Sequence, residues 1–174
     1  MTFHLEEGAL EVDLSPSNED LAWDVYFEFK SGITDVTGTI FHSVSSGNGD
    51  VFKIAVINGS VVSVLCGLGG LEDVEEILVQ DQILADNQWH SLMVEWNMKE
   101  TTVYLDKNAS VVEKARKQIP RRPLTLASKV SVGATIDFSD GFLGCFRSLW
   151  INGLRIDLKE QMHPKAQWII LPRS

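Results

Sequence analysis

Side chains able to act as nucleophiles, bases and acids are scattered through the sequence without the spacing that catalysis needs. Nucleophilic catalysis requires a Ser or Cys beside a His base that an acidic group orients. The sequence has no Gly-x-Ser-x-Gly motif, and none of its four His residues lies in a recognisable nucleophile motif; they are His4, His42, His90 and His163. His90 alternates with apolar positions, so we interpret it as a packed, hydrogen-bonded residue. The sequence therefore predicts no enzymatic activity.

Two other kinds of chemistry need thiols or carboxylates at close spacing. A zinc site requires clustered Cys and His, but the two Cys residues, Cys66 and Cys145, are far apart in the sequence. A glycoside hydrolase requires two carboxylates about 5–10 Å apart in a groove. Asp137 and Asp140 are the nearest candidates, and their short loop argues against this alternative.

Charge is distributed unevenly along the chain. The 174 residues have a formal net charge of −9, yet residues 107–130 carry seven basic side chains against one acidic side chain, Glu113. Nucleic acid is not expected as a partner, because it calls for a broadly basic face.

Period-two patterns predict the strands that must position these side chains. Alternate positions of Trp89–Asn97 separate into two sets, and a turn leads into a second alternating strand that ends at Asp106, which together predict a hairpin. Asn58-Gly59 is a strong signal for another hairpin turn. Further strands are predicted at Ala9–Leu14, Ala22–Lys30, Gly38–Val44, Val51–Ile57, Ser60–Cys66, Ile77–Val79, Val130–Gly133, Leu143–Ile151 and Leu154–Ile156.

Two of these segments leave alternatives. Val111–Gln118 is predicted to be an irregular loop, with a short helix as the alternative, and Pro120 and Pro123 exclude regular structure just beyond it. Leu143–Ile151 has apolar residues on both faces, which indicates either a fully buried strand or a β-bulge.

These elements predict an all-β protein. Strands that recur about every eight to twelve residues, tight turns and the lack of a long helical pattern indicate an antiparallel β-sandwich. No apolar run approaches the roughly 18–20 residues of a membrane span. We assign residues 1–160 to one domain and residues 161–174 to a C-terminal tail. Of the Trp residues we expect all to lie in the core except Trp150 and Trp168, which we leave unassigned.

Two separated motifs, in a fixed order, carry a resemblance to a known family. The first is Asp86-x-x-Trp89-His90 with its return strand Val103–Asp106. The second is Gly141-Phe142-Leu143-Gly144-Cys145-Phe146-Arg147-Ser148-Leu149, followed by Asn152-Gly153 and Ile156-Asp157-Leu158. Over nearly its whole length the chain resembles a laminin G-like (LNS) domain, most of all those of the neurexin and contactin-associated group. The resemblance implies a jelly roll of two curved, concanavalin-like sheets.

The resemblance also implies a location and a function. Laminin G-like domains usually lie within larger secreted or single-pass membrane proteins that carry EGF-like domains, disulfides and glycans. Met1–Glu7 lacks the basic start and apolar centre of a signal peptide, so we interpret the chain as a fragment of such an extracellular protein. The expected function is a non-enzymatic recognition and cell-adhesion module. It would bind a cell-surface or matrix protein, or a glycan, through loops at the rim of the sandwich.

A calcium-supported lectin is the alternative function. Many laminin G-like domains bind calcium at the rim with two Asp side chains on neighbouring loops, and oxygen ligands suit this cation. Asp50 lies near the first of those positions, whereas the second carries Ser128-Lys129, whose lysine opposes a cation. Asp137 and Asp140 would have to substitute from the next loop. A chain without a cofactor, in which Asp50 only forms a turn, is the other interpretation.

The basic segment supplies a candidate site for a sulphated glycan, a ligand that laminin G-like domains often bind. Basic side chains on one loop would pair with sulphates through charge-assisted hydrogen bonds. The candidates are Lys114, Arg116, Lys117, Arg121 and Arg122. The alternative is a loop without a ligand, either solvated or paired with the acidic run Glu72–Glu76 of the same chain.

The resemblance gives Cys145 a specific position, because the family places one half of a disulfide there. No Cys follows it in this sequence. Cys145 has therefore lost its partner with the end of the chain, or is a free thiol, or pairs with Cys66. Two glycosylation triplets begin at Asn58 and Asn108, both at predicted turns.

Overall fold

The computed structural model of the chain is built from strands and the turns that join them. It describes residues 3–7, 10–14, 22–69, 74–80, 82–106, 112–116, 122–137, 139–158 and 167–170. The strands are β1 (Phe3–Glu7), β2 (Leu10–Asp13), β3 (Ala22–Lys30), β4 (Gly38–Val44), β5 (Val51–Ile57), β6 (Val61–Gly67), β7 (Val74–Val79), β8 (His90–Asn97), β9 (Glu100–Leu105), β10 (Val112–Arg116), β11 (Lys129–Val132), β12 (Gly144–Ile151), β13 (Leu154–Arg155) and β14 (Gln167–Ile170). Over these ranges there is no helix, so none is long and apolar enough to cross a membrane.

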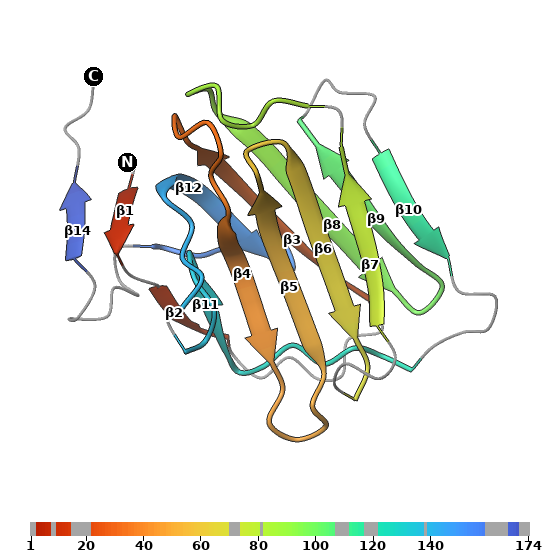
Figure 1. The fold of residues 1–174 in the computed structure, drawn as a ribbon. Helices are drawn as coiled ribbons and strands as arrows, with labels where there is room; N and C mark the ends of the chain where they lie inside the picture. The colour runs from red at the N-terminus through yellow and green to blue at the C-terminus, as the bar shows by residue number, and fades with distance from the viewer. Residues whose placement is uncertain are drawn as a thin grey trace.

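The strands form two antiparallel sheets, as the sequence predicts. The eight-stranded sheet, called sheet A here, has the order β10-β9-β8-β3-β12-β1-β14, with β13 paired to β12. The six-stranded sheet, called sheet B, has the order β2-β11-β4-β5-β6-β7. Figure 1 shows strands β4 to β7 of sheet B lying in front of β3, β8 and β9 of sheet A. The protein is therefore an all-β sandwich of the jelly-roll class.

A single hydrophobic core fills the space between the sheets. Burial alternates along β3, β5 and β8, so that every second side chain of each strand faces the other sheet. Trp23 and Trp96 stack in this core with ring centroids 5.8 Å apart, and Phe52 meets the Trp23 ring edge-on at 4.5 Å. Fully burying a large apolar side chain contributes about 1.5–3 kcal/mol, so this cluster holds the two layers together.

Two predictions made from the sequence are wrong. Residues Val112–Arg116 form strand β10 and pair with β9, although the surrounding segment was predicted to be an irregular loop or a short helix. A charged strand at the edge of a sheet lacks the apolar alternation by which strands are recognised. Trp89 was expected in the core, but it is only half-buried, and the guanidinium of Arg147 lies 4.1 Å from its ring centroid.

Residues 167–170 of the predicted C-terminal tail and the whole Leu143–Ile151 segment lie within the described residues. The tail contributes β14, whose backbone pairs with β1 in sheet A. Within β12 the register with β3 shifts between Arg147 and Trp150, and Ser148 has a left-handed backbone with φ of 60°. This is the β-bulge that the sequence offered as one of two alternatives.

Candidate recognition surfaces

Asp50 lies at the end of the β4–β5 loop and is fully buried. Its carboxylate receives two hydrogen bonds from the Arg122 guanidinium, at 2.8 Å from Nη1 to Oδ2 and at 2.5 Å from Nη2 to Oδ1. The backbone amides of Thr125 and Gly69 donate to the same two oxygens at 2.9 Å. Four donors, from three residues on two other segments of the chain, therefore converge on one carboxylate.

The electrostatics of Asp50 follow from this geometry. Burial by itself raises the pKa of the carboxyl, but the hydrogen bonds from Arg122, Thr125 and Gly69 outweigh it and hold the pKa below its usual range. Each oxygen already accepts two hydrogen bonds, which uses the lone pairs that a calcium ion would need. In the part of the chain that the structure describes, no group of three or more His, Cys, Asp or Glu is placed to hold a metal. These donors do not fit a calcium site, because Arg122 already supplies the positive charge.

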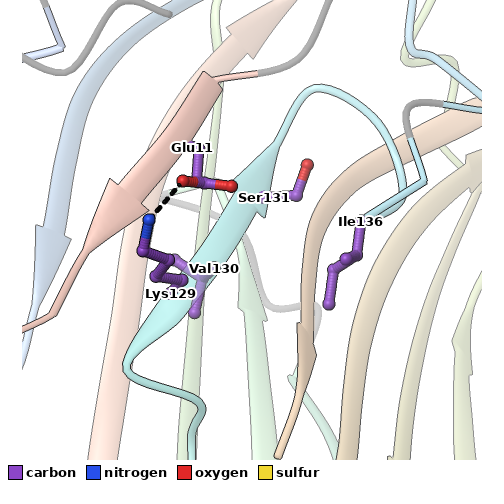
Figure 2. A pocket seen from close by; sticks show the side chains of 5 residues that line it. All are labelled: Glu11, Lys129, Val130, Ser131 and Ile136. Carbon is purple, nitrogen blue, oxygen red and sulfur yellow. Dashed lines mark hydrogen bonds and ion pairs between the residues drawn. The ribbon is translucent and has the colours of Figure 1, made fainter.

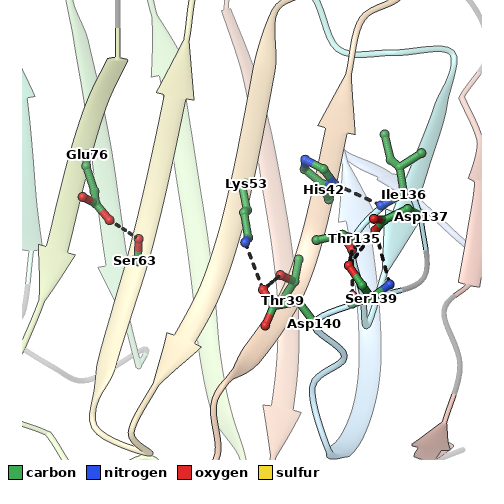
Figure 3. A network of polar contacts seen from close by, with 10 residues as sticks. All are labelled: Thr39, His42, Lys53, Ser63, Glu76, Thr135, Ile136, Asp137, Ser139 and Asp140. Atoms are coloured by element: carbon green, nitrogen blue, oxygen red, sulfur yellow. Dashed lines mark hydrogen bonds and ion pairs between the residues drawn. The ribbon is translucent and has the colours of Figure 1, made fainter. Parts of the chain in front are cut away.

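Asp140 is one of the two carboxylates that could have replaced the second calcium ligand. It connects its loop to sheet B (Figure 3). Its Oδ2 accepts hydrogen bonds from Lys53 Nζ at 3.0 Å and from Thr39 Oγ1 at 2.8 Å. These bonds outweigh the effect of burial and lower the pKa of Asp140. The loop also needs Gly38, since a Cβ there would lie 2.4 Å from the carbonyl oxygen of Gly141.

Asp137 closes the same loop from within. It accepts hydrogen bonds from the hydroxyls of Thr135 and Ser139, and these lower its pKa to about 2. Both Asp137 and Asp140 are therefore ionised near neutral pH. A glycoside hydrolase needs one carboxylic acid that keeps its proton, so this pair does not support that alternative.

His42 connects the loop to the face of the sheet. Its Nδ1 accepts a hydrogen bond from the amide of Ile136 at 3.1 Å. Desolvation, together with the positive charge of Lys53, lowers the pKa of the imidazole. A neutral ring keeps the acceptor that Ile136 needs, so His42 positions the loop and has no partner arrangement typical of a catalytic base.

The outer face of sheet B carries apolar side chains on both sides of a polar row. The polar row runs across the strands through Glu76, Lys53 and His42, with Leu65 as its apolar member between Glu76 and Lys53. On one side lie Val44, Val51 and Val74, and on the other lie Leu78 and Ala55. Exposed fractions of 37% for Val44, 38% for Val74, 43% for Leu78 and 41% for Ile136 show that much of this apolar surface meets solvent. We call this set the sheet B face.

A small hollow lies at one edge of the sheet B face (Figure 2). It is lined by Glu11, Lys129, Val130, Ser131 and Ile136, with a volume of about 30 Å³. Lys129 Nζ bonds Glu11 Oε1 at 2.8 Å along its wall. A volume near that of one water molecule is too small for a sugar ring or a peptide side chain of any size. This hollow therefore does not serve as a binding pocket for either.

The five basic candidates for glycan binding fall in different environments. Arg122 is bound to Asp50, so its guanidinium already has a carboxylate partner. Lys114 and Arg116 lie on the edge strand β10, opposite Thr102 and Glu100 of β9. Lys117 and Arg121 lie outside the described residues.

The two Cys residues and one of the two glycosylation positions are also placed. Cys66 and Cys145 are both buried thiols on strands of different sheets, and no disulfide joins them. Burial raises the pKa of the Cys145 thiol, which makes it a poor nucleophile. Asn58 is exposed at the β5–β6 turn with φ of 50°, where a glycan could be attached, whereas Asn108 lies outside the described residues.

His90 is the packed histidine that the sequence predicts. It is buried, and its two ring nitrogens lie 3.0 Å from Asp106 Oδ2 and 3.0 Å from Asp86 Oδ1. Asp106 also accepts the Ser91 amide at 2.9 Å. The Asp-x-x-Trp-His motif therefore closes the loop before β8 against the turn after β9, which is a structural task.

Some residues of these surfaces were not identified from the sequence. The partnership of Asp50 with Arg122 joins positions far apart in the chain, and a single sequence gives no signal for it. The exposed members of the sheet B face, such as Leu78, have the composition of ordinary strand residues. Exposed aliphatic residues next to charged ones in β7 were the available signal.

The fold and these surfaces define a two-sheet antiparallel sandwich with hydrogen-bonded rim loops and an exposed apolar face. The laminin G domain family matches residues 33–154, and the chain belongs to that family. Neurexin-4 of Drosophila melanogaster is 31% identical over 161 residues, which is 92% of this chain, and the chain spans 12% of the length of that relative.

Solved structures show the same fold. The pair of domains LG4-5 of the mouse laminin alpha1 chain matches with a TM-score of 0.78 at 14% identity, covering 95% of this chain and 45% of that chain. The CBM40 of the Ruminococcus gnavus IT-sialidase, bound to α2,3-sialyllactose, matches with a TM-score of 0.63 at 12% identity, covering 92% of this chain and 96% of that chain.

Proposed function

We propose that the chain is a non-enzymatic recognition module of an extracellular, membrane-anchored protein, and that it binds a protein partner through the sheet B face and the adjoining 135–140 loop. The observation that carries this proposal is the exposed apolar surface around Leu78, Val44 and Ile136. Apolar surface on a rigid scaffold, crossed by a polar row, has the composition of a protein contact with charged groups that set its register. Membership of the laminin G domain family and the 31% identity to Neurexin-4 support this function.

Binding of the chain to cultured neurons and epithelial cells tests the proposal. The chain is fused to an antibody Fc, and Leu78→Glu and Ile136→Glu are compared with Ile83→Glu, whose side chain is 70% exposed on the segment between β7 and β8. We expect the two face variants to weaken binding at least about tenfold, as at a contact residue, and the control to bind like the wild type. Trypsin treatment of the cells should remove the binding. Equal loss in all three variants, or binding that persists after trypsin, would refute a protein contact at this face.

A sulphated glycan is the second candidate ligand, at a different place. Lys114 and Arg116 are two residues apart on the edge strand β10, so both occupy register positions of the same face of sheet A. Two cations spaced along a strand suit a linear polyanion. Retention on heparin should fall when both residues are changed to Gln, and it should stay unchanged in Lys129→Gln, whose lysine is paired with Glu11. Retention that is the same in all variants would discard this ligand.

A further inference from the structure

The outer face of sheet A carries a row of aromatic and thioether side chains that neither proposal above uses. Trp150 of β12 lies opposite Tyr26 of β3, Tyr26 lies opposite Met93 of β8, and Met93 lies opposite Tyr104 of β9. Neighbouring strands are about 4.8 Å apart, so the row spans roughly 14 Å across four strands. Figure 1 shows these strands side by side in the rear layer.

The β-bulge in β12 aims Trp150 at this face. Without the extra residue, strict alternation after the outward Arg147 would turn Leu149 outward and Trp150 inward. With Ser148 in a left-handed conformation, Leu149 is instead buried at 1% exposure and Trp150 is 38% exposed. The bulge therefore buries a Leu and exposes the larger Trp, which gives up hydrophobic stabilisation. A strand with only a structural role would be expected to bury the Trp.

The tyrosines of the row donate their hydroxyl protons to neighbouring carboxylates. Tyr26 Oη donates to Glu28 Oε1 at 3.1 Å, and Tyr104 Oη donates to Glu95 Oε2 at 3.0 Å. Glu95 accordingly raises the pKa of Tyr104. A phenol that gives its proton to a carboxylate keeps acceptor lone pairs on its oxygen. The ligand should therefore bring hydroxyl or amide donors.

Charges around the row cancel. The acidic residues on the flanking rows are Asp24, Glu28 and Glu95, and the basic residues nearby are Arg147, Arg155 and Lys114, the last by its register position. Arg147 Nε already bonds Glu28 Oε2 at 2.7 Å. The row itself therefore gives no long-range attraction to a polyanion or a basic peptide, in contrast to the edge strand β10 beyond it, where Lys114 and Arg116 form the candidate site for a sulphated glycan.

We propose that this row is a carbohydrate-binding site for an uncharged oligosaccharide, which it binds without a metal ion. The rings of Trp150, Tyr26 and Tyr104 supply flat apolar surface for the C–H faces of successive sugar rings. The carboxylates and phenol oxygens at the edges accept hydrogen bonds from the sugar hydroxyls. The site lies on the sheet opposite to the proposed protein contact, so either function can fail without the other.

Isothermal titration calorimetry with a neutral poly-N-acetyllactosamine hexasaccharide tests the site, in buffer containing EDTA. We expect measurable binding with a Kd below about 1 mM, because a shallow aromatic surface gives modest affinity. Trp150→Ala should weaken it about tenfold or more, the loss expected for one stacked aromatic ring. Tyr104→Phe keeps the ring and removes the oxygen, and about a threefold loss is expected.

The control variant is Ile83→Ser, which removes an exposed apolar side chain far from the row in sequence and should bind like the wild type. Thermal unfolding establishes that each variant is folded, and Met93→Gln replaces any variant that is not. A heparin hexasaccharide and an octalysine peptide are titrated in parallel. The proposal is overturned if the neutral hexasaccharide does not bind, if Trp150→Ala binds as tightly as the control, or if only heparin or only the basic peptide depends on Trp150.

Discussion

Two arginine–carboxylate pairs show how the same chemistry serves different purposes in two regions of the molecule. In the first pair, at the β4–β5 rim, Asp50 is fully buried and every oxygen lone pair is used within the chain. In the second, on the outer face of sheet A, Glu28 bonds Arg147, and the guanidinium also covers the Trp89 ring at 4.1 Å. The first pair joins three segments and has no capacity left for a ligand. The second lies among exposed rings and hydroxyls, where a ligand can add contacts.

The difference teaches where recognition chemistry can reside in this fold. Asp50 is the residue that the family resemblance marks for calcium, yet the structure uses it as the anchor for Arg122, Thr125 and Gly69. The outer faces, which carry no residue with an unusual type or spacing, hold the groups that remain accessible. Spare hydrogen-bonding capacity, and not the residue type alone, distinguishes a binding surface from a structural contact.

The largest expected effect comes from removing the buried carboxylate. Asp50→Ala leaves the amides of Thr125 and Gly69 and the guanidinium of Arg122 without their acceptor, and we expect a loss of about 2–4 kcal/mol in the free energy of unfolding. Urea denaturation measures it. The matched control is Asp35→Ala, an exposed carboxylate in the turn between β3 and β4, for which a much smaller loss is expected. Equal losses in the two variants would show that Asp50 is not an anchor.

Acid should weaken both arginine pairs. The pKa values of Asp50 and Glu28 are lower in the folded chain than their ordinary values. Such groups contribute stability that is fully present above the unfolded pKa, near 4, and is lost as the pH falls through the folded pKa. The free energy of unfolding should therefore decrease from about pH 5 to about pH 2, less steeply in Asp50→Ala than in the wild type. Parallel slopes in the two proteins would contradict this assignment.

The outer pair should contribute less to stability than the buried one. Arg147→Ala removes the ion pair with Glu28 and the cation–π contact with Trp89, both partly open to solvent. A loss of about 1 kcal/mol is expected. Comparison with Arg147→Lys, which keeps the charge but not the planar group, separates the two contributions. A loss as large as that of Asp50→Ala would remove the contrast between the regions.

Calcium should have the smallest effect. Extracellular calcium modules bind with dissociation constants of about 0.1–1 mM, so about 10 mM calcium would stabilise an intact site by more than about 1 kcal/mol. We expect no change in the Tm beyond about 1 °C, because Arg122 occupies the Asp50 carboxylate. Differential scanning fluorimetry with calcium, magnesium and EDTA measures this. A rise of several degrees that is specific to calcium would restore the calcium-supported lectin.

The fold could be predicted largely from the sequence because half-buried strands leave a period-two pattern. The strand Ala22–Lys30 was predicted with the bounds that the structure gives it, and the Asn58-Gly59 turn adopts the left-handed backbone that a tight hairpin requires. The strand Val112–Arg116 was missed because it lies at the edge of sheet A, where a strand does not need apolar alternation. The half-buried position of Trp89 was missed because a Trp at the start of a strand is usually a core residue. The sequence gives no sign that Arg147 covers its ring.

The surfaces could be predicted less well, for a physical reason. Asp50 meets Arg122, and Trp150 meets Tyr26, only after sheets and loops bring distant segments together. Local periodicity predicts where the strands are, but it does not predict their order across a sheet. The row of Trp150, Tyr26, Met93 and Tyr104 comes from four strands and depends on one bulge, so only the pairing register reveals it.

The most direct test of the account is the binding of the Fc-fused chain to cells in the presence of EDTA, with Leu78→Glu and Ile83→Glu measured beside the wild type. We predict that wild-type binding survives removal of divalent cations and falls at least about tenfold in Leu78→Glu alone. Binding that EDTA abolishes, while Leu78→Glu binds like Ile83→Glu, would contradict recognition through the sheet B face and return the function to a metal site at the rim.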